Sequence, residues 1–247
     1  MTIACLGWGS LVWKPEDLPV LGIWHCDGPK LPVEFARESM NGRITLVITK
    51  GSPVVPLLWA KLAVQSVEEA RNVLAAREGI PAKNVHRDIG FWCGNKSSDH
   101  EEATSVAAWA SSKNIDAVVW TALPPKFQKE NHRSPSKDDV ISYLRGLEGK
   151  TQLLAEEYVR RAPIQIQTPY RAAIERELQW NAMPAGNAIV RSMQIDAKAW
   201  SFSGIRSADS GRADKLEASG SPDELHKELE GAIWRSEERR VGKECRS

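Results

Sequence analysis

The sequence contains no long apolar run. No stretch of its 247 residues approaches the roughly 18 consecutive apolar residues that a membrane-spanning helix needs. Residues 1–11 also lack the charged start of a secretory leader, and Gly7 and Gly9 interrupt them. We therefore expect a cytoplasmic protein with no membrane partner.

Cysteine is scarce, and its spacing fits neither disulfides nor zinc. Cys5, Cys26 and Cys93 form no Cys-x-x-Cys pair, and no histidine follows them at zinc-finger spacing. Isolated cysteines of this kind are typical of reduced or buried thiols. The sequence therefore predicts no disulfide framework and no metal site.

The chain has no excess of either charge. Residues 235–247 resemble the in-frame translation of a synthetic sequencing adapter, so we set them aside and expect the natural C-terminus to be missing or altered. Without the five basic and three acidic residues of that segment, 28 basic and 29 acidic residues remain. Proteins that bind nucleic acid through their backbone phosphates are usually basic. We therefore expect no nucleic-acid partner.

Motifs for nucleotide cofactors are incomplete. Residues 149–151 (GKT) follow Leu144, where a phosphate-binding loop needs its first glycine. Residues 7–9 (GWG) continue to Val12, where the dinucleotide fingerprint needs glycine or alanine. The sequence therefore implies no cofactor.

What the chain does have is a short apolar segment at its start that runs into a glycine-bracketed turn, Gly7-Trp8-Gly9-Ser10-Leu11. Two glycines around one residue let the backbone turn tightly and point successive N–H groups into one concavity. Such a concavity is suited to an anion. Glycines at a strand end also occur for steric reasons alone, so the turn predicts either an anion site or a plain junction.

A second informative segment is the helix predicted over residues 66–78. Ser66 and Glu69 have the spacing of a capping box. Gly79 is typical of the position after a helix, and Pro81 prevents its continuation. The helix is therefore bounded at both ends by sequence alone.

Glu78 lies at the end of the apolar stripe of this helix. At about 100° per residue it falls within roughly 40° of Val67 and Leu74. It meets the negative end of the helix dipole and is partly removed from water, and both effects raise the pKa of its carboxyl group. A carboxyl of this kind exchanges protons near neutral pH. The alternative is a frayed last turn, or pairing of Glu78 with Arg71 or Arg77.

Together the two segments resemble the γ-glutamylcyclotransferase superfamily, which includes a glutathione-specific branch and AIG2-like proteins. Its members have a first strand that enters a Gly-Tyr-Gly-Ser-Leu loop, and a later Leu-x-x-x-Glu-Gly-(Val/Ile) helix end with the catalytic glutamate. Residues 7–13 (GWGSLVW) and 74–80 (LAAREGI) are similar to these motifs. The resemblance covers roughly residues 2–160. It departs from the family at Trp8, where tyrosine is usual, and over residues 81–95, which lack an expected tyrosine.

The fold class expected from the order of elements is α+β, because predicted strands come early and predicted helices late. We expect strands at 2–6, 31–37, 43–49, 56–64 and 115–121, and helices at 66–78, 137–147, 150–160 and 169–180. The resemblance implies a small mixed β-barrel flanked by helices, over residues 1–182. Residues 183–234 are expected to form a polar, partly disordered extension before the adapter-like segment 235–247.

The activity implied by the resemblance is cyclisation of a γ-glutamyl group to 5-oxoproline with release of an amine. The nucleophile is the α-amine of the substrate, so the protein has to orient the chain, move protons and hold charge. Glu78 is the candidate for both proton transfers, which supply roughly 10²- to 10⁴-fold of the acceleration.

The substrate-binding candidates are the amides and side chains of the glycine-bracketed turn, together with one arginine: Gly7, Trp8, Gly9, Ser10, Leu11 and Arg37. Amides of the turn are suited to the α-carboxylate or the developing oxyanion of the substrate. Arg37 or Arg43 adds positive charge, unless these are strand-pairing or surface residues.

The substrate class expected is a γ-glutamyl amine, amino acid or peptide, with glutathione as one candidate. Two other hypotheses remain open on the sequence. One is a non-catalytic binding module of the same fold, which holds a small carboxylate ligand or a partner protein. The other is a relative that hydrolyses or transfers other amides or esters, which a non-cyclic product would identify.

Overall fold

The computed structural model describes residues 1–183, and the findings below concern that part of the chain. The expected extension from residue 184 onward and the adapter-like segment 235–247 lie outside the described residues.

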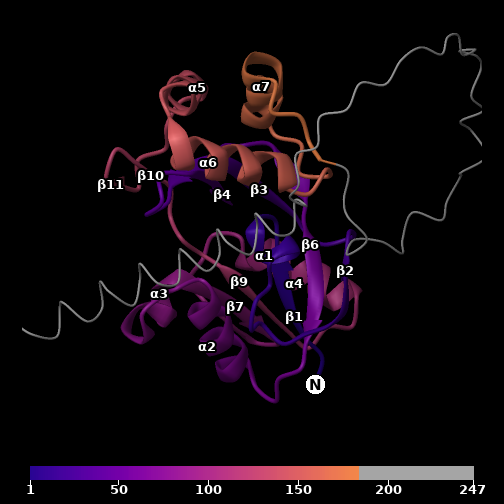
Figure 1. Cartoon of the computed structure of the whole chain (residues 1–247). Helices are drawn as coiled ribbons and strands as arrows, with labels where there is room; N and C mark the ends of the chain where they lie inside the picture. The colour runs from indigo at the N-terminus through magenta and orange to yellow at the C-terminus, as the bar shows by residue number, and fades with distance from the viewer. Residues whose placement is uncertain (184–247) are drawn as a thin grey trace, which may run out of the picture. The chain divides into compact units, whose positions relative to one another are not determined.

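The described residues contain two β-sheets with helices around them, which confirms the α+β class (Figure 1). The first sheet has the order β2-β6-β1-β9-β7-β8. Its strands are β1 (Ile3–Gly7), β2 (Val20–His25), β6 (Leu58–Leu62), β7 (Ile89–Cys93), β8 (Lys96–Ser97) and β9 (Ala117–Thr121). β1 pairs antiparallel with β6 and parallel with β9, so the sheet is mixed. Because β1 lies inside the sheet and is buried along its whole length, it is a continuous apolar run.

The second sheet has the order β11-β10-β3-β4, with β5 also paired to β3. Its strands are β3 (Lys30–Glu38), β4 (Ile44–Ile48), β5 (Val54–Pro56), β10 (Lys126–Phe127) and β11 (Glu130–Asn131). β4 ends the strand order of this sheet, so it pairs with a strand on one side only. The backbone groups on its other side therefore need partners from elsewhere.

The helices divide between the two sheets (Figure 1). α2 (Val67–Arg77) and α4 (Ala103–Ser112) pack against strands of the first sheet. α6 (Gly149–Arg161) and α7 (Pro169–Leu178) pack against the second, and α5 (Lys137–Arg145) packs against α7. The shorter helices are α1 (Ser10–Trp13), η1 (Ala82–Asn84) and α3 (Val85–Asp88).

The ends of α2 largely follow the sequence prediction. The Ser66 side chain accepts the N–H of Glu69, as a capping box requires. The reciprocal bond differs, because the Glu69 carboxylate accepts the N–H of Gln65 rather than that of Ser66. Gly79 has a left-handed φ of 65°, which confirms the predicted helix end.

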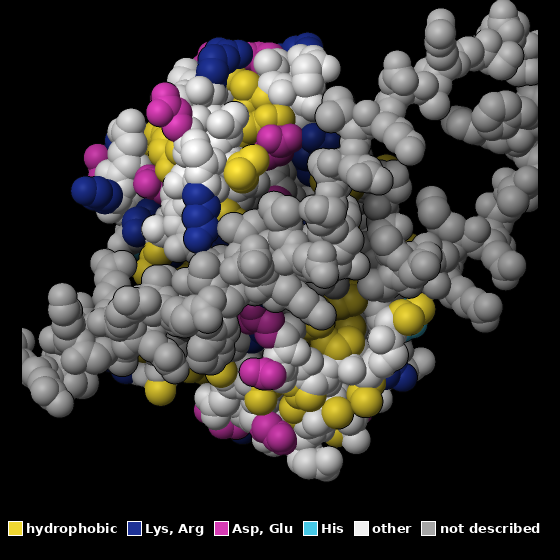
Figure 2. Space-filling view, viewed as in Figure 1, with side chains coloured by type: hydrophobic (Ala, Val, Ile, Leu, Met, Phe, Trp, Pro, Cys, Tyr) yellow, Lys and Arg dark blue, Asp and Glu magenta, His cyan; other side chains and the backbone are white. Residues whose placement is uncertain are grey.

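The described residues bear on the expectations of no nucleic-acid partner and no membrane partner. In the visible face of Figure 2, acidic and basic side chains are interspersed over the part of the surface that the structure describes. Within residues 1–183, no helix combines the length and apolar character that crossing a bilayer requires.

Candidate functional site

The predicted glycine-bracketed turn joins β1 to α1, and we call it the Gly7–Leu11 loop. Gly9 is the N-cap of α1, and its carbonyl accepts the N–H of Val12 at 3.0 Å. The loop is closely packed: a Cβ on Gly7 would lie 2.6 Å from the Trp24 ring. Leu11 is buried, whereas Ser10 is partly exposed.

Trp8 connects this loop to the second sheet. Its side chain is buried, and its Nε1 donates a hydrogen bond of 3.0 Å to the carbonyl of Leu46 on β4. The N–H of the same Leu46 donates to the Tyr158 hydroxyl at 3.2 Å. At Leu46, the backbone groups on the unpaired side of β4 are thus satisfied by two aromatic side chains. A role of Trp8 in substrate binding stays a prediction.

Glu78 is held at the end of α2 by a Schellman turn. The N–H of Gly79 donates to Ala76 at 3.1 Å, and that of Ile80 donates to Ala75 at 2.8 Å. The helix end is therefore ordered, not frayed. The Glu78 side chain is 19% exposed, and its Oε1 accepts a hydrogen bond of 2.8 Å from Arg77.

Burial decides the protonation behaviour of Glu78. Loss of hydration raises the pKa of its carboxyl group, and the negative charge of Glu16 raises it further. The charges of Arg77 and Arg43, with the hydrogen bond from Arg77, oppose this effect. The pKa of Glu78 nevertheless stays above its ordinary value. The ion pair between Glu78 and Arg77, which the sequence left as an alternative, is present. The side chain of Glu78 is nevertheless largely buried.

Arg77 joins the two sequence motifs in space. Its guanidinium donates to Glu78 through Nη1, and to the Ser10 hydroxyl and the Lys14 carbonyl through Nη2, at 3.3 and 2.6 Å. Its side chain is only 9% exposed. One arginine therefore bridges the carboxylate at the end of α2 and the hydroxyl of the Gly7–Leu11 loop. This contact places both motifs at one site.

Two further side chains lie within electrostatic reach of Glu78. Burial raises the pKa of the Cys5 thiol on β1, and the charge of Glu78 adds to that effect. Burial also raises the pKa of Tyr158 to about 12, again with a contribution from Glu78. Both groups therefore stay protonated and neutral at physiological pH.

The two candidate arginines occupy different places. Arg37 on β3 donates to the carbonyl of Pro124 at 2.6 Å, and burial lowers the pKa of its guanidinium. None of its described hydrogen bonds reaches Glu78 or the Gly7–Leu11 loop, so its role stays a prediction. Arg43 lies with its guanidinium carbon 5.7 Å from the centre of the Tyr158 ring and acts electrostatically on Glu78.

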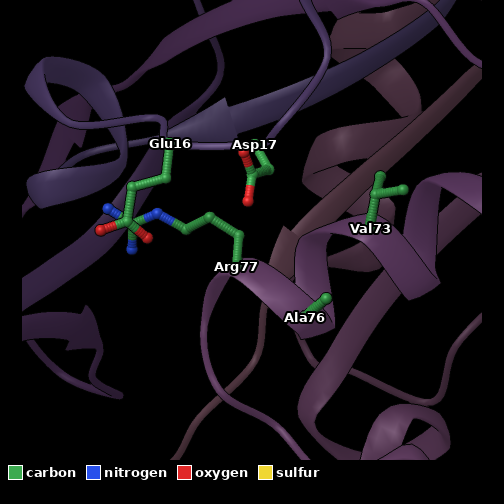
Figure 3. A pocket seen from close by; sticks show the side chains of 5 residues that line it. All are labelled: Glu16, Asp17, Val73, Ala76 and Arg77. Carbon is green, nitrogen blue, oxygen red and sulfur yellow. The ribbon is translucent and has the colours of Figure 1, made fainter. Parts of the chain in front are cut away.

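A cavity of about 200 Å³ borders the site (Figure 3). Val73, Ala76 and Arg77 line it from α2, and Glu16 and Asp17 line it from the segment that follows α1. Arg77 therefore contributes both to this cavity and to the contact with Glu78. Glu16 is one of the two acidic residues on the cavity wall, and its charge raises the pKa of Glu78.

Sequence reasoning did not identify three of these residues as parts of the site: Arg77 as a bridge, Glu16 as a neighbouring charge, and Tyr158. Tyr158 lies within a segment correctly predicted to be helical, but nothing in that helix marks one tyrosine as belonging to a site.

Within the described residues, no group of three or more His, Cys, Asp or Glu side chains is placed to hold a metal ion. No family model and no curated protein matches the chain.

Proposed function

We propose that this protein cyclises the γ-glutamyl group of a small γ-glutamyl amine, amino acid or peptide to 5-oxoproline and releases the amine. Glutathione is one candidate substrate. The observation that carries the proposal is the Arg77 bridge, which brings a largely buried carboxyl of raised pKa beside the Gly7–Leu11 loop. The assignment of the fold as a cyclotransferase-like small barrel, and of the protein as cytoplasmic, belongs to the same proposal.

Glu78 has the properties that the two proton transfers require. The α-ammonium of the substrate has to lose a proton before its nitrogen attacks, and the leaving nitrogen has to gain one. A carboxyl of raised pKa is a better base when ionised and holds the proton until the leaving group needs it. The burial of Glu78 produces that property in this chain.

The Gly7–Leu11 loop supplies the groups that bind negative charge. Gly9 is the N-cap of α1, and the first N–H groups of a helix have no acceptor within that helix. These donors are suited to the α-carboxylate of a γ-glutamyl compound. With the carboxylate held there and the amine near Glu78, the flexible chain is folded so that its own amine meets the γ-carbonyl.

The experiment is a 5-oxoproline release assay on the full chain with a panel of γ-glutamyl compounds that includes glutathione. We expect Glu78→Gln to lower release by roughly 10²-fold or more, because it removes the proton carrier. The folded state and substrate affinity should change little. Glu68→Gln is the matched control, since Glu68 is an exposed carboxylate on the same helix.

A Glu78→Gln variant with normal turnover would disprove the role of Glu78. Absence of 5-oxoproline from every compound, with a folded wild-type chain, would disprove the cyclisation. The non-catalytic binding module would then be favoured, because the ion pair between Arg77 and Glu78 already gives the carboxylate a structural partner. Release of free glutamate instead would indicate hydrolysis.

A further inference from the structure

Tyr158 is held rigidly beside the site. The ring of Trp13 meets it edge-on with centroids 5.5 Å apart, and the ring of Phe35 does so at 6.4 Å. Arg43 lies over its ring. The whole residue is only 5% exposed. The position of its hydroxyl group is therefore set by packing on several sides.

The Tyr158 hydroxyl has a proton to donate. Its oxygen accepts the N–H of Leu46 at 3.2 Å. Among the residues that the structure describes, no group accepts a hydrogen bond from this hydroxyl. A buried donor without an acceptor is unfavourable, so in a native protein such a group calls for an explanation, and a role in binding or catalysis is one.

The hydroxyl oxygen also lies directly against the Gly7–Leu11 loop. A Cβ on Gly9 would clash with this oxygen, so only glycine permits the approach. Glu78 is near enough for its charge to act on the same phenol. Within the described residues, this hydroxyl therefore lies against one part of the proposed site and within electrostatic reach of the other.

We propose that the Tyr158 hydroxyl donates a hydrogen bond to the γ-carbonyl oxygen of the substrate and stabilises the oxyanion that forms there. This assignment rests on the proposed cyclisation. During the reaction the γ-carbon is bonded to its oxygen, to the attacking nitrogen and to the leaving nitrogen. Glu78 moves a proton between these two nitrogens. A donor that lies against the Gly7–Leu11 loop and within electrostatic reach of Glu78 suits that oxygen.

The step balances without another reactant besides solvent water. Glu78 takes one proton from the α-ammonium, the freed nitrogen forms a bond to the γ-carbon, the π electrons of the carbonyl move to its oxygen, and the nitrogen loses its second surplus proton to water. When the oxyanion collapses, the bond to the leaving nitrogen breaks and Glu78 returns the proton to that nitrogen. Tyr158 keeps its proton throughout, as its pKa of about 12 requires.

The test compares Tyr158→Phe with wild type in the 5-oxoproline assay. We expect kcat to fall roughly 10²-fold, as when an oxyanion donor is removed, with KM nearly unchanged. Tyr170→Phe is the matched control, because it also removes a tyrosine hydroxyl that makes one hydrogen bond, to the carbonyl of Pro135. That variant should keep the wild-type kcat.

A second measurement separates oxyanion stabilisation from a structural role. The substrate that wild type turns over fastest is bound to Glu78→Gln and to the double variant Glu78→Gln, Tyr158→Phe. Equal Kd values are expected, because the proposed bond strengthens only in the transition state. A loss of affinity that matches the loss of kcat/KM would overturn the proposal, since Tyr158 would then hold the ground state.

The failure of this proposal and that of the proposed function give different results. If wild type releases 5-oxoproline, Glu78→Gln does not, and Tyr158→Phe has the wild-type kcat, the cyclisation stands and the role of Tyr158 is disproved. If folded wild type releases none, the cyclisation fails, and the role assigned to Tyr158 fails with it.

Discussion

At the scale of single residues, Glu78 combines two opposing influences. Its burial favours the neutral carboxyl group, and its bond to Arg77 favours the charged one. Burial is the larger effect, so the folded protein holds this proton more tightly than the unfolded chain does. Such a group lowers stability at neutral pH and is therefore typical of a functional position.

This imbalance predicts a pH dependence of stability. Because the pKa of Glu78 is higher in the folded than in the unfolded state, a proton bound to its carboxyl group stabilises the fold. This contribution is present at pH values below the ordinary pKa of 4.5 and is lost as the pH rises through the folded pKa. Glu78→Gln should therefore be more stable than wild type at neutral pH, and this advantage should disappear in acid. Urea unfolding between about pH 4 and 8 measures it.

The exposed carboxylate variant Glu68→Gln provides the comparison for that experiment. It should show no such gain in stability at neutral pH. A Glu78→Gln variant that is less stable than wild type at neutral pH would mean that the bond to Arg77, not burial, dominates at this position.

At the scale of elements, α2 determines where Glu78 lies. Its Schellman turn makes Glu78 the last residue with helical geometry, and Gly79 then reverses the chain in a left-handed conformation. Ile80 and Ala75, which the turn brings together, are both buried. The helix end and the catalytic candidate are therefore fixed by the same few backbone bonds.

We predict that Gly79→Ala destabilises the protein by about 1–2 kcal/mol, because an alanine in the left-handed region is strained. A Cβ there would meet no neighbour, so the cost is conformational only. The change should also move Glu78 and lower 5-oxoproline release roughly tenfold or more. Chemical denaturation and the release assay measure the two effects.

Gly51→Ala is the matched control for this prediction. Gly51 has a φ of 83° and open space around it, so its backbone strain is comparable. It lies between β4 and β5, away from Glu78 in sequence and fold. Equal losses of turnover in the two variants would show that general destabilisation, not the position of Glu78, is responsible.

At the scale of the whole molecule, the site lies where the two sheets are joined. The Gly7–Leu11 loop extends from the first sheet, and Leu46 lies on the end strand of the second. Trp8 and Tyr158 both bind the backbone of Leu46, and the Tyr158 hydroxyl rests against Gly9. The contact between the sheets and the proposed oxyanion site thus depend on the same side chains.

The fit between Gly9 and Tyr158 predicts a specific coupling. Gly9→Ala should destabilise wild type by about 1–3 kcal/mol, because the new methyl group and the hydroxyl oxygen require the same space. In the Tyr158→Phe background the oxygen is absent, and the nearest ring atom lies 3.2 Å from the added Cβ. The same substitution should therefore cost less there. A double-mutant cycle by denaturant unfolding measures the difference, and additive costs would contradict it.

Several elements were predictable because local chemistry determines them. The apolar segment of β1, the Ser66 cap and the Gly79 stop all follow from neighbouring residues, and α2 accordingly lies within one residue of its predicted limits. β2 was missed because Gly22, with a φ of 78°, interrupts the pattern, and its pairing with β6 shifts register. α4 (ATSVAAWASS) was missed because small alanines and serines give a weak apolar stripe.

The sequence by itself determined the two ends of the site: a tight glycine turn after the first strand, and a glutamate at a capped helix end. Both are set by backbone conformation within a few residues. Only the tertiary structure decided that Arg77 bridges them, that burial outweighs its charge at Glu78, and that Tyr158 presents a hydroxyl beside Gly9. These features depend on how two sheets and their helices pack, because burial and contact between distant residues arise only when the chain is folded.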